Sequence, residues 1–116
     1  MSTLPFAPWR RAGDWISFSG LIGMENGRPA DGLDRQVKVI FSTLDERLHS
    51  AGAQRSDIVK CTLWLKDLEN WATVNDHYAE YFTGPELPTR STVGAQLLPG
   101  YLLELEVWAY QKPLAR

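Results

Sequence analysis

The sequence predicts one α+β domain, residues 1–116, in which a mixed β-sheet carries two helices on one face. Two observations predict this fold. Apolar residues alternate with polar ones in five short segments, as in strands, and recur at every third or fourth position in two longer segments, as in amphipathic helices. The predicted order is strand, strand, helix, strand, helix, strand, strand, and two helices can cover only one face of such a sheet.

The first two predicted strands form a hairpin. Residues 9–12 and 15–20 have the alternation of strands, and the pair Gly13–Asp14 between them marks a tight turn. Residues 21–31 contain glycine, proline and aspartate, so they predict a loop.

A helix is predicted over residues 33–50. Its apolar residues fit the helical period: Leu33, Val37, Ile40, Phe41, Leu44 and Leu48. Asp31 is the candidate N-cap, and Gly52 is the candidate C-cap because glycine tolerates left-handed backbone.

A third strand and a second helix follow. Residues 58–65 predict a strand whose apolar face consists of Val59, Cys61, Leu63 and Leu65. Asp67 is expected to cap a helix over residues 68–82. The apolar side of that helix consists of Trp71, Val74, Tyr78 and either Tyr81 or Phe82.

Residues 90–97 and 103–108 predict the last two strands, with a turn between them. Arg90 lies on the polar face of the first strand and Glu104 on the polar face of the second. If these strands pair antiparallel, the two side chains share one face. An arginine that binds a carboxylate, close to an acid that moves protons, suits a small hydrolytic site. A structural ion pair of Arg90 with Glu104 or Glu106 explains the same pattern equally well.

The sheet face without helices is predicted to be polar, with large aromatic side chains among the charges. It consists of Ser17, Ser19, Lys60, Thr62, Trp64, Arg90, Thr92, Glu104, Glu106 and Trp108. Such a face is expected to pack against other subunits. Oligomerisation would also add burial that a domain of this size lacks.

Composition argues against several function classes. The net charge of −2 and the pI of about 5.6 argue against general nucleic-acid binding, which needs a basic patch. No apolar run is long enough to span a membrane, and the N-terminus lacks the basic region of a signal peptide. The single cysteine, Cys61, fits a reducing, cytoplasmic location. His49 and His77 are far apart in the sequence, and no metal site is predicted.

Several short motifs resemble the RidA/YjgF family, also called the Rid or L-PSP family, in their order and spacing over nearly the whole chain. They lie at residues 11–14, 18–22, 51–53, 57–62, 65–75, 88–91, 98–99 and 104–106. The resemblance implies a chorismate-mutase-like (YjgF-like) fold and a homotrimer with three equivalent sites between subunits.

The resemblance also implies an activity, the hydrolysis of reactive enamines and imines to 2-oxo acids and ammonia. The substrates are 2-imino acids of the 2-aminoacrylate type, and no cofactor is expected because the imine carbon is already electrophilic. Two alternatives stay open: a non-catalytic trimer that binds small carboxylates, and a deaminase of one degradation route, of aminoacrylate or aminomuconate type. A ribonuclease, an activity sometimes attributed to the family, fits poorly with the acidic pI.

Carried over position by position, the catalytic residues of the family fall on two positions of this chain. The resemblance assigns carboxylate binding to Arg90 and the orientation of water to Glu104. Its serine and glycine fall on Ser19 and Gly20, and its helix asparagine falls on Asn75.

The chain departs from the family pattern at two further substrate-binding positions. Phe6 stands where many members have tyrosine, which replaces a hydrogen-bonding phenol by an apolar wall. Thr92 stands where many members have cysteine, a change with less effect if the backbone N–H contacts the ligand.

Overall fold

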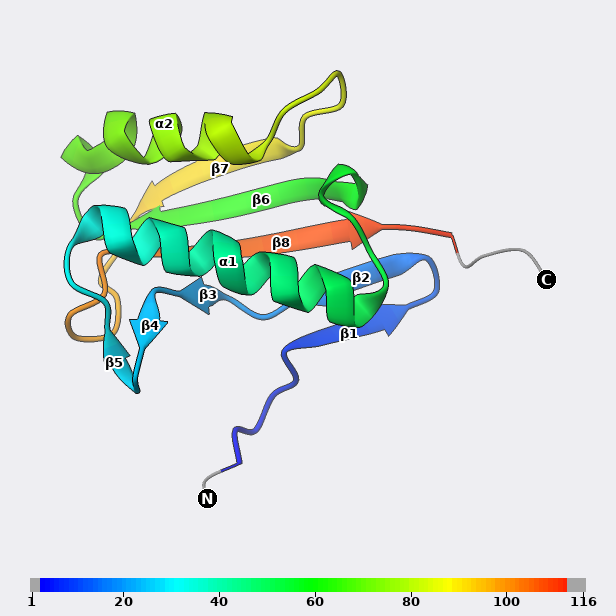
Figure 1. The fold of residues 1–116 in the computed structure, drawn as a ribbon, viewed down its shortest axis with the longest axis horizontal. Helices are drawn as coiled ribbons and strands as arrows, with labels where there is room; N and C mark the ends of the chain where they lie inside the picture. Colours follow the sequence, from blue (N-terminus) through cyan, green and yellow to red (C-terminus); the bar gives the residue numbers. More distant parts are fainter. Residues whose placement is uncertain (1–2, 113–116) are drawn as a thin grey trace.

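Two helices form one layer and a β-sheet forms the other in the computed structural model, which describes residues 3–112 (Figure 1). The strands are β1 Trp9–Ala12, β2 Trp15–Phe18, β3 Leu21–Ile22, β4 Met24–Glu25, β5 Arg28–Pro29, β6 Ile58–Leu65, β7 Thr89–Gly94 and β8 Leu103–Tyr110. The helices are α1 Leu33–Ala51 and α2 Trp71–Tyr81, with short 3₁₀ turns η1 Arg55–Asp57 and η2 Leu68–Asn70. The predicted fold class is confirmed.

The main sheet has the order β1-β2-β8-β6-β7, and β3 pairs with β8 beyond the end of β2. Only β6 and β7 run parallel. The expected pairing of the strands around Arg90 and Glu104 is therefore wrong, because β6 lies between β7 and β8. Helix α2 connects β6 to β7 as a crossover, which is how a parallel neighbour is reached, and this leaves the other edge of β6 to β8.

The predicted faces of β7 are also inverted. Arg90 is paired with Cys61 and Thr92 with Leu63, so both lie on the side of the sheet that faces the helices. Val93 points the other way and is 45% exposed. Because β7 is an edge strand, Arg90 lies at the margin of the core and meets Asn75 and Tyr78 of α2.

Helix α1 packs across the sheet and buries the apolar face that its sequence predicts. The core includes Ile16, Phe18, Val37, Ile40, Leu44, Leu48, Leu63, Leu65, Leu103, Leu105 and Val107. The helix ends at Gly52, as predicted, with a φ of 74°. It begins after Gly32 without a side-chain cap, so the prediction for Asp31 is wrong.

Three local expectations need correction. Val59 is 42% exposed because a bulge between Ile58 and Lys60 shifts the register, and Ile58 is buried in its place. Trp71 is 50% exposed, because it begins α2 beyond the edge of the core. Residues 21–31 contain β3 and a hairpin of β4 and β5, whose Asn26–Gly27 turn has positive φ at both positions.

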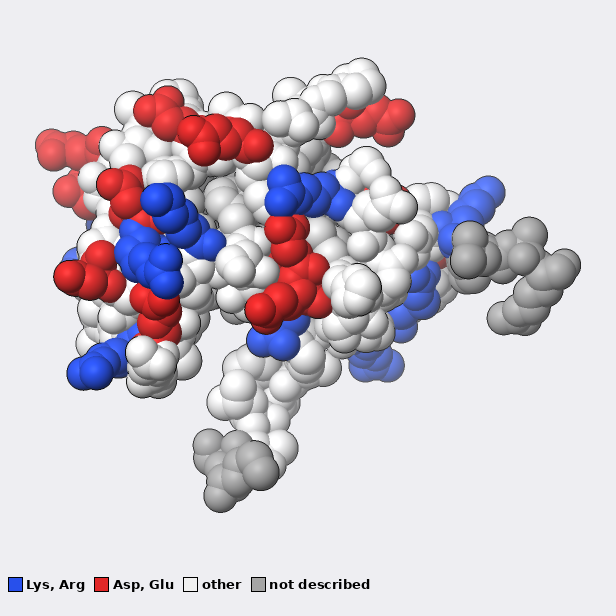
Figure 2. Space-filling model, viewed as in Figure 1, with Lys and Arg blue, Asp and Glu red and all other residues white. Residues whose placement is uncertain are grey.

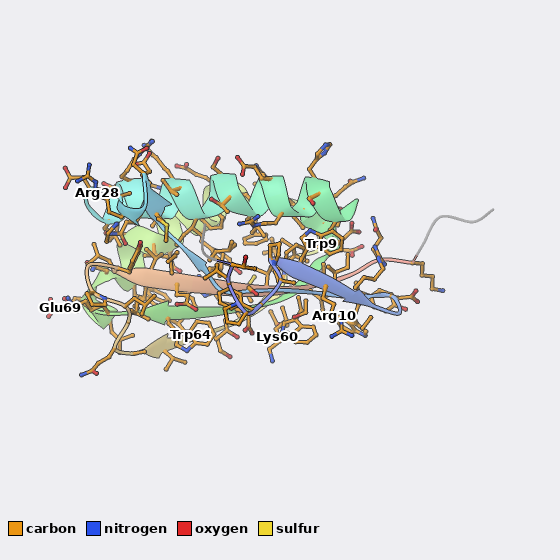
Figure 3. The ribbon with its side chains drawn as sticks, turned by 90° about the horizontal axis from the view of Figure 1, so that it is seen from below. Trp9, Arg10, Arg28, Lys60, Trp64 and Glu69 are labelled. Atoms are coloured by element: carbon orange, nitrogen blue, oxygen red, sulfur yellow. The ribbon has the colours of Figure 1, made fainter. Side chains whose placement is uncertain are left out.

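The other sheet face, called the uncovered face below, carries the side chains expected there apart from Arg90, Thr92 and Ser19, which lies between β2 and β3. It consists of Ser17, Lys60, Thr62, Trp64, Glu104, Glu106 and Trp108. Figure 3 shows Lys60 and Trp64 on the side of the sheet opposite α1. Within residues 3–112 no helix combines the length and apolar character needed to cross a membrane.

Candidate functional site

Arg90 lies at the β7 edge of the sheet, beneath α2. Its Nη2 donates a hydrogen bond to Oδ1 of Asn75 at 2.6 Å, and its guanidinium carbon lies 4.6 Å from the centre of the Tyr78 ring. Asn75 and Tyr78 are three positions apart on α2, so they project from the same face of the helix. No carboxylate of the described residues forms an ion pair with Arg90. The Arg90 guanidinium is therefore oriented by uncharged neighbours, and its other N–H groups can donate hydrogen bonds to a ligand.

Cys61 lies under this arrangement in the core. Burial raises the pKa of its thiol to about 11, against the opposing influence of Tyr78 and Arg90. The thiol stays protonated at neutral pH and is no nucleophile. The hydroxyl oxygen of Tyr78 is buried and has no hydrogen-bond partner among the described residues, and burial also raises the pKa of this phenol. Thr92 follows Arg90 on the same face of β7.

A second group of predicted residues lies at the β3 edge. Phe6, Ser19 and Gly20 line one groove of about 570 Å³ between the N-terminal segment, β3 and α1. The remaining lining residues are Leu4, Pro8, Leu21, Ile22, Met24, Thr43, Glu46 and Arg47. Neither the hollow between α1 and α2 nor the one between η1 and the end of α2 contains any of the predicted site residues.

Ser19 fastens the N-terminal segment to the sheet. Its Oγ donates to the carbonyl oxygen of Ala7 at 2.6 Å, and its backbone N–H donates to the carbonyl oxygen of Pro8 at 3.1 Å. The segment that carries Phe6 is thus held beside β3. The structure places Ser19 as a support of the groove wall.

Glu104 lies next to this groove on the uncovered face. A Cβ at position 20 would collide with the Glu104 carboxylate, so any side chain there would displace the acid from its present position. Burial and then the negative charge of Glu106 raise the pKa of Glu104. A carboxyl group with a raised pKa is better matched to proton transfer near neutral pH than an ordinary glutamate.

The seven predicted residues therefore form two groups. Arg90, Asn75 and Thr92 meet at β7, whereas Phe6, Ser19, Gly20 and Glu104 meet at β3 and β8. Arg90 and Glu104 face opposite sides of the sheet and are separated by β6, which excludes the ion pair between them within one chain. No group of three or more potential ligand side chains for a metal occurs in residues 3–112.

Four residues near the site were not predicted as contributors. Tyr78 was expected only in the helix core, although its spacing of three from Asn75 indicates the shared face. Thr43, Glu46 and Arg47 of α1 also line the groove, and their spacing places them on one helix face.

Comparisons with known proteins agree with the fold and the motifs. The family model described as Endoribonuclease L-PSP matches residues 2–111. A RutC family protein of Pyrococcus abyssi is 36% identical over 115 residues, which cover 93% of this chain and 90% of that protein. The 2-iminobutanoate/2-iminopropanoate deaminase of Rattus norvegicus is 36% identical over 102 residues, covering 84% and 74%. A crystal structure of a Rid family protein of unknown function from Yersinia pestis superposes with a TM-score of 0.88 at 32% identity, covering 94% and 90%.

Proposed function

Since the chain belongs to the RidA/YjgF (L-PSP) family, we propose that it hydrolyses 2-imino acids of the 2-aminoacrylate type to 2-oxo acids and ammonia. The observation that carries this proposal is the state of Arg90. Its guanidinium is held by Asn75 and Tyr78, is half-buried, and has no ion-pair partner among the described residues. A guanidinium that is held in position and has no ion-pair partner can bind a carboxylate ligand through two hydrogen bonds.

The proposed reaction needs a group that binds the substrate carboxylate, a water molecule, and a group that carries protons. Arg90 binds the substrate carboxylate through two parallel N–H groups, which fixes the neighbouring C=N carbon. Glu104 accepts a proton from water as its oxygen attacks that carbon, and delivers a proton to the nitrogen. The hydroxyl group of the resulting carbinolamine then gives its proton to the nitrogen through Glu104, the C–N bond breaks, ammonia leaves, and the C=O bond of the 2-oxo acid forms. Backbone N–H groups near Gly20 or Thr92 would donate further hydrogen bonds to the substrate carboxylate.

The two groups of residues must come from different chains for this reaction. We propose a homotrimer in which β7 of one subunit meets the β3 edge of the next, which gives three equivalent sites. A contact between two different edges closes into a ring when the rotation allows it. Exposed aromatic residues support burial of the uncovered face, since Trp108 is 38% exposed in the single chain and Trp15, two positions before Ser17 on the same face of β2, is 42% exposed.

Substitutions at Arg90 and Glu104 test the mechanism. Arg90→Ala should lose both binding and turnover, and Arg90→Lys should also be poor because an ammonium cannot reproduce the planar fork. Glu104→Gln should keep much of the binding and lose turnover by about 10²-fold or more. A coupled assay that generates the imine in place measures turnover, and titration with a stable 2-oxo acid measures binding.

Each outcome identifies a different function. Full activity in Arg90→Ala would refute the proposed site. Binding of 2-oxo acids by the wild type without deamination of any imine would identify a non-catalytic carboxylate-binding protein. Turnover of aminoacrylate or aminomuconate alone would identify a deaminase of one degradation route. RNA cleavage, which the name of the family model raises, is disfavoured by the mixed charges over the helix face (Figure 2).

A further inference from the structure

The groove at the β3 edge is mostly apolar. Its apolar wall consists of Leu4, Phe6, Pro8, Leu21, Ile22 and Met24. Leu4, Phe6 and Met24 are 63%, 58% and 47% exposed, so large apolar side chains stand open to solvent around one hollow. In Figure 2 the surface is notched between the N-terminal segment and the β4–β5 hairpin, below α1. Its charged lining residues, Glu46 and Arg47, both come from α1.

The groove begins where the proposed proton carrier lies. Ile22 is the cross-strand partner of Glu104, and Gly20 touches the Glu104 carboxylate. Both Ile22 and Gly20 line the groove. A substrate whose reacting carbon is placed at Glu104, with its carboxylate directed to the Arg90 of another chain, would therefore have its side chain next to the groove.

Hydrogen bonds hold the N-terminal wall of the groove in place beside β3. The two hydrogen bonds from Ser19 to the carbonyl oxygens of Ala7 and Pro8 fix the N-terminal segment against β3. Because Phe6 replaces a phenol, this wall offers no hydroxyl to a polar side chain of the substrate. A prearranged apolar surface favours ligands that bury apolar groups against it.

On the basis of the proposed deamination, we infer that this groove receives the substrate side chain and selects 2-imino acids with bulky apolar side chains. In the single chain the groove has a volume of about 570 Å³, which exceeds what the methyl group of an alanine-derived imino acid can fill. Each additional methylene group that is buried in such a pocket raises kcat/KM by about tenfold or more. The imino acids derived from leucine and phenylalanine fit this description.

The test compares imines generated in place by an amino-acid oxidase from alanine, leucine and phenylalanine. We expect kcat/KM for the leucine-derived and phenylalanine-derived substrates to exceed that of the alanine-derived one by at least about tenfold. Leu4→Arg and Met24→Arg place a charge in the apolar wall and should reduce this ratio. Leu87→Arg is the matched control, since Leu87 is 64% exposed like Leu4 but lies outside the groove, and it should leave the ratio unchanged.

Binding of stable products separates the failure of this inference from the failure of the proposed function. Calorimetric titration should show that 4-methyl-2-oxopentanoate binds more tightly than pyruvate to the wild type, and that Leu4→Arg removes the difference. Turnover of all three imines with similar kcat/KM would overturn the side-chain groove and leave the deaminase standing. No turnover, together with equal affinity for the two 2-oxo acids, would overturn both. No turnover with the expected difference in affinity would overturn the deaminase alone and support the groove as a binding pocket.

Discussion

Tyr78 supports Arg90 through its ring and not through its hydroxyl group. The ring lies under the guanidinium, whereas the hydroxyl oxygen is buried without a hydrogen-bond partner among the described residues. Tyr78→Phe should therefore keep activity and unfold at a urea concentration no lower than the wild type. Tyr78→Leu should raise KM by between about twofold and about thirtyfold, the range of a cation–π contact worth about 0.5–2 kcal/mol.

KM and kcat for one imino acid, with the urea midpoints of all three proteins, check this prediction. Tyr78→Phe is the control, because it preserves the ring and removes only the unpaired hydroxyl. A leucine variant with lowered stability but an unchanged KM would show that the ring only packs against the core.

Glu104 gives a prediction for pH dependence. Its pKa is raised by burial and then by the charge of Glu106, so the carboxylate form appears only at a higher pH than in an ordinary glutamate. If the carboxylate accepts the proton of water, kcat/KM falls on the acid side as this group becomes protonated. Glu106→Gln removes one cause of the shift, lowers the pKa of Glu104, and should move the acid limb to lower pH.

The measurement is kcat/KM against pH for the wild type and Glu106→Gln with the same substrate. The chemical imine hydrolysis at each pH, measured without protein, is subtracted. An acid limb that stays in place would mean that another group titrates.

The elements themselves differ in how far the sequence predicts them. The predicted helix 33–50 is found as α1, Leu33–Ala51, and β6 has the predicted bounds, because long periodic segments hold the pattern that burial requires. The hairpin of β4 and β5 was missed, although its Asn26–Gly27 turn is a strong signal. The bulge at Ile58 could not be foreseen, because one extra residue leaves no mark on local alternation.

The arrangement of the candidate site was less predictable than its residues. Local alternation in β7 identifies two faces, but it does not tell which strand becomes the neighbour. Pairing with β6 placed Arg90 beneath α2, and pairing of β8 with β6 placed Glu104 on the uncovered face. The contact of Arg90 with Asn75 and the groove beneath the N-terminal segment both depend on tertiary packing.

For the whole molecule, the two groups of site residues predict exchange between subunits. In the proposed trimer, a site needs Arg90 from one chain and Glu104 from another. Arg90→Ala and Glu104→Gln, each inactive alone, should therefore regain activity when denatured together, mixed and refolded. In a random equal mixture, about half of the chains carry an intact Arg90 and about half carry an intact Glu104. About a quarter of the sites would therefore combine both intact residues.

Native mass spectrometry of the mixture supplies the control, and should show assemblies of three chains of 13.1 kDa each. Variants refolded separately and mixed afterwards should stay inactive until their subunits exchange. Assemblies that contain both variants without any recovered activity would mean that each site lies within one chain.

The position of Arg90 and Glu104 on opposite faces of the sheet also affects how activity depends on expression level. In the proposed arrangement a single chain is folded but has no complete site, and only assembled trimers are active. At concentrations where the trimer dissociates, total activity therefore rises more steeply than in proportion to the protein concentration. Cells that make little of this protein would then have far less deaminase activity than their copy number indicates. Dilution alone, without loss of fold, would be enough to switch the activity off.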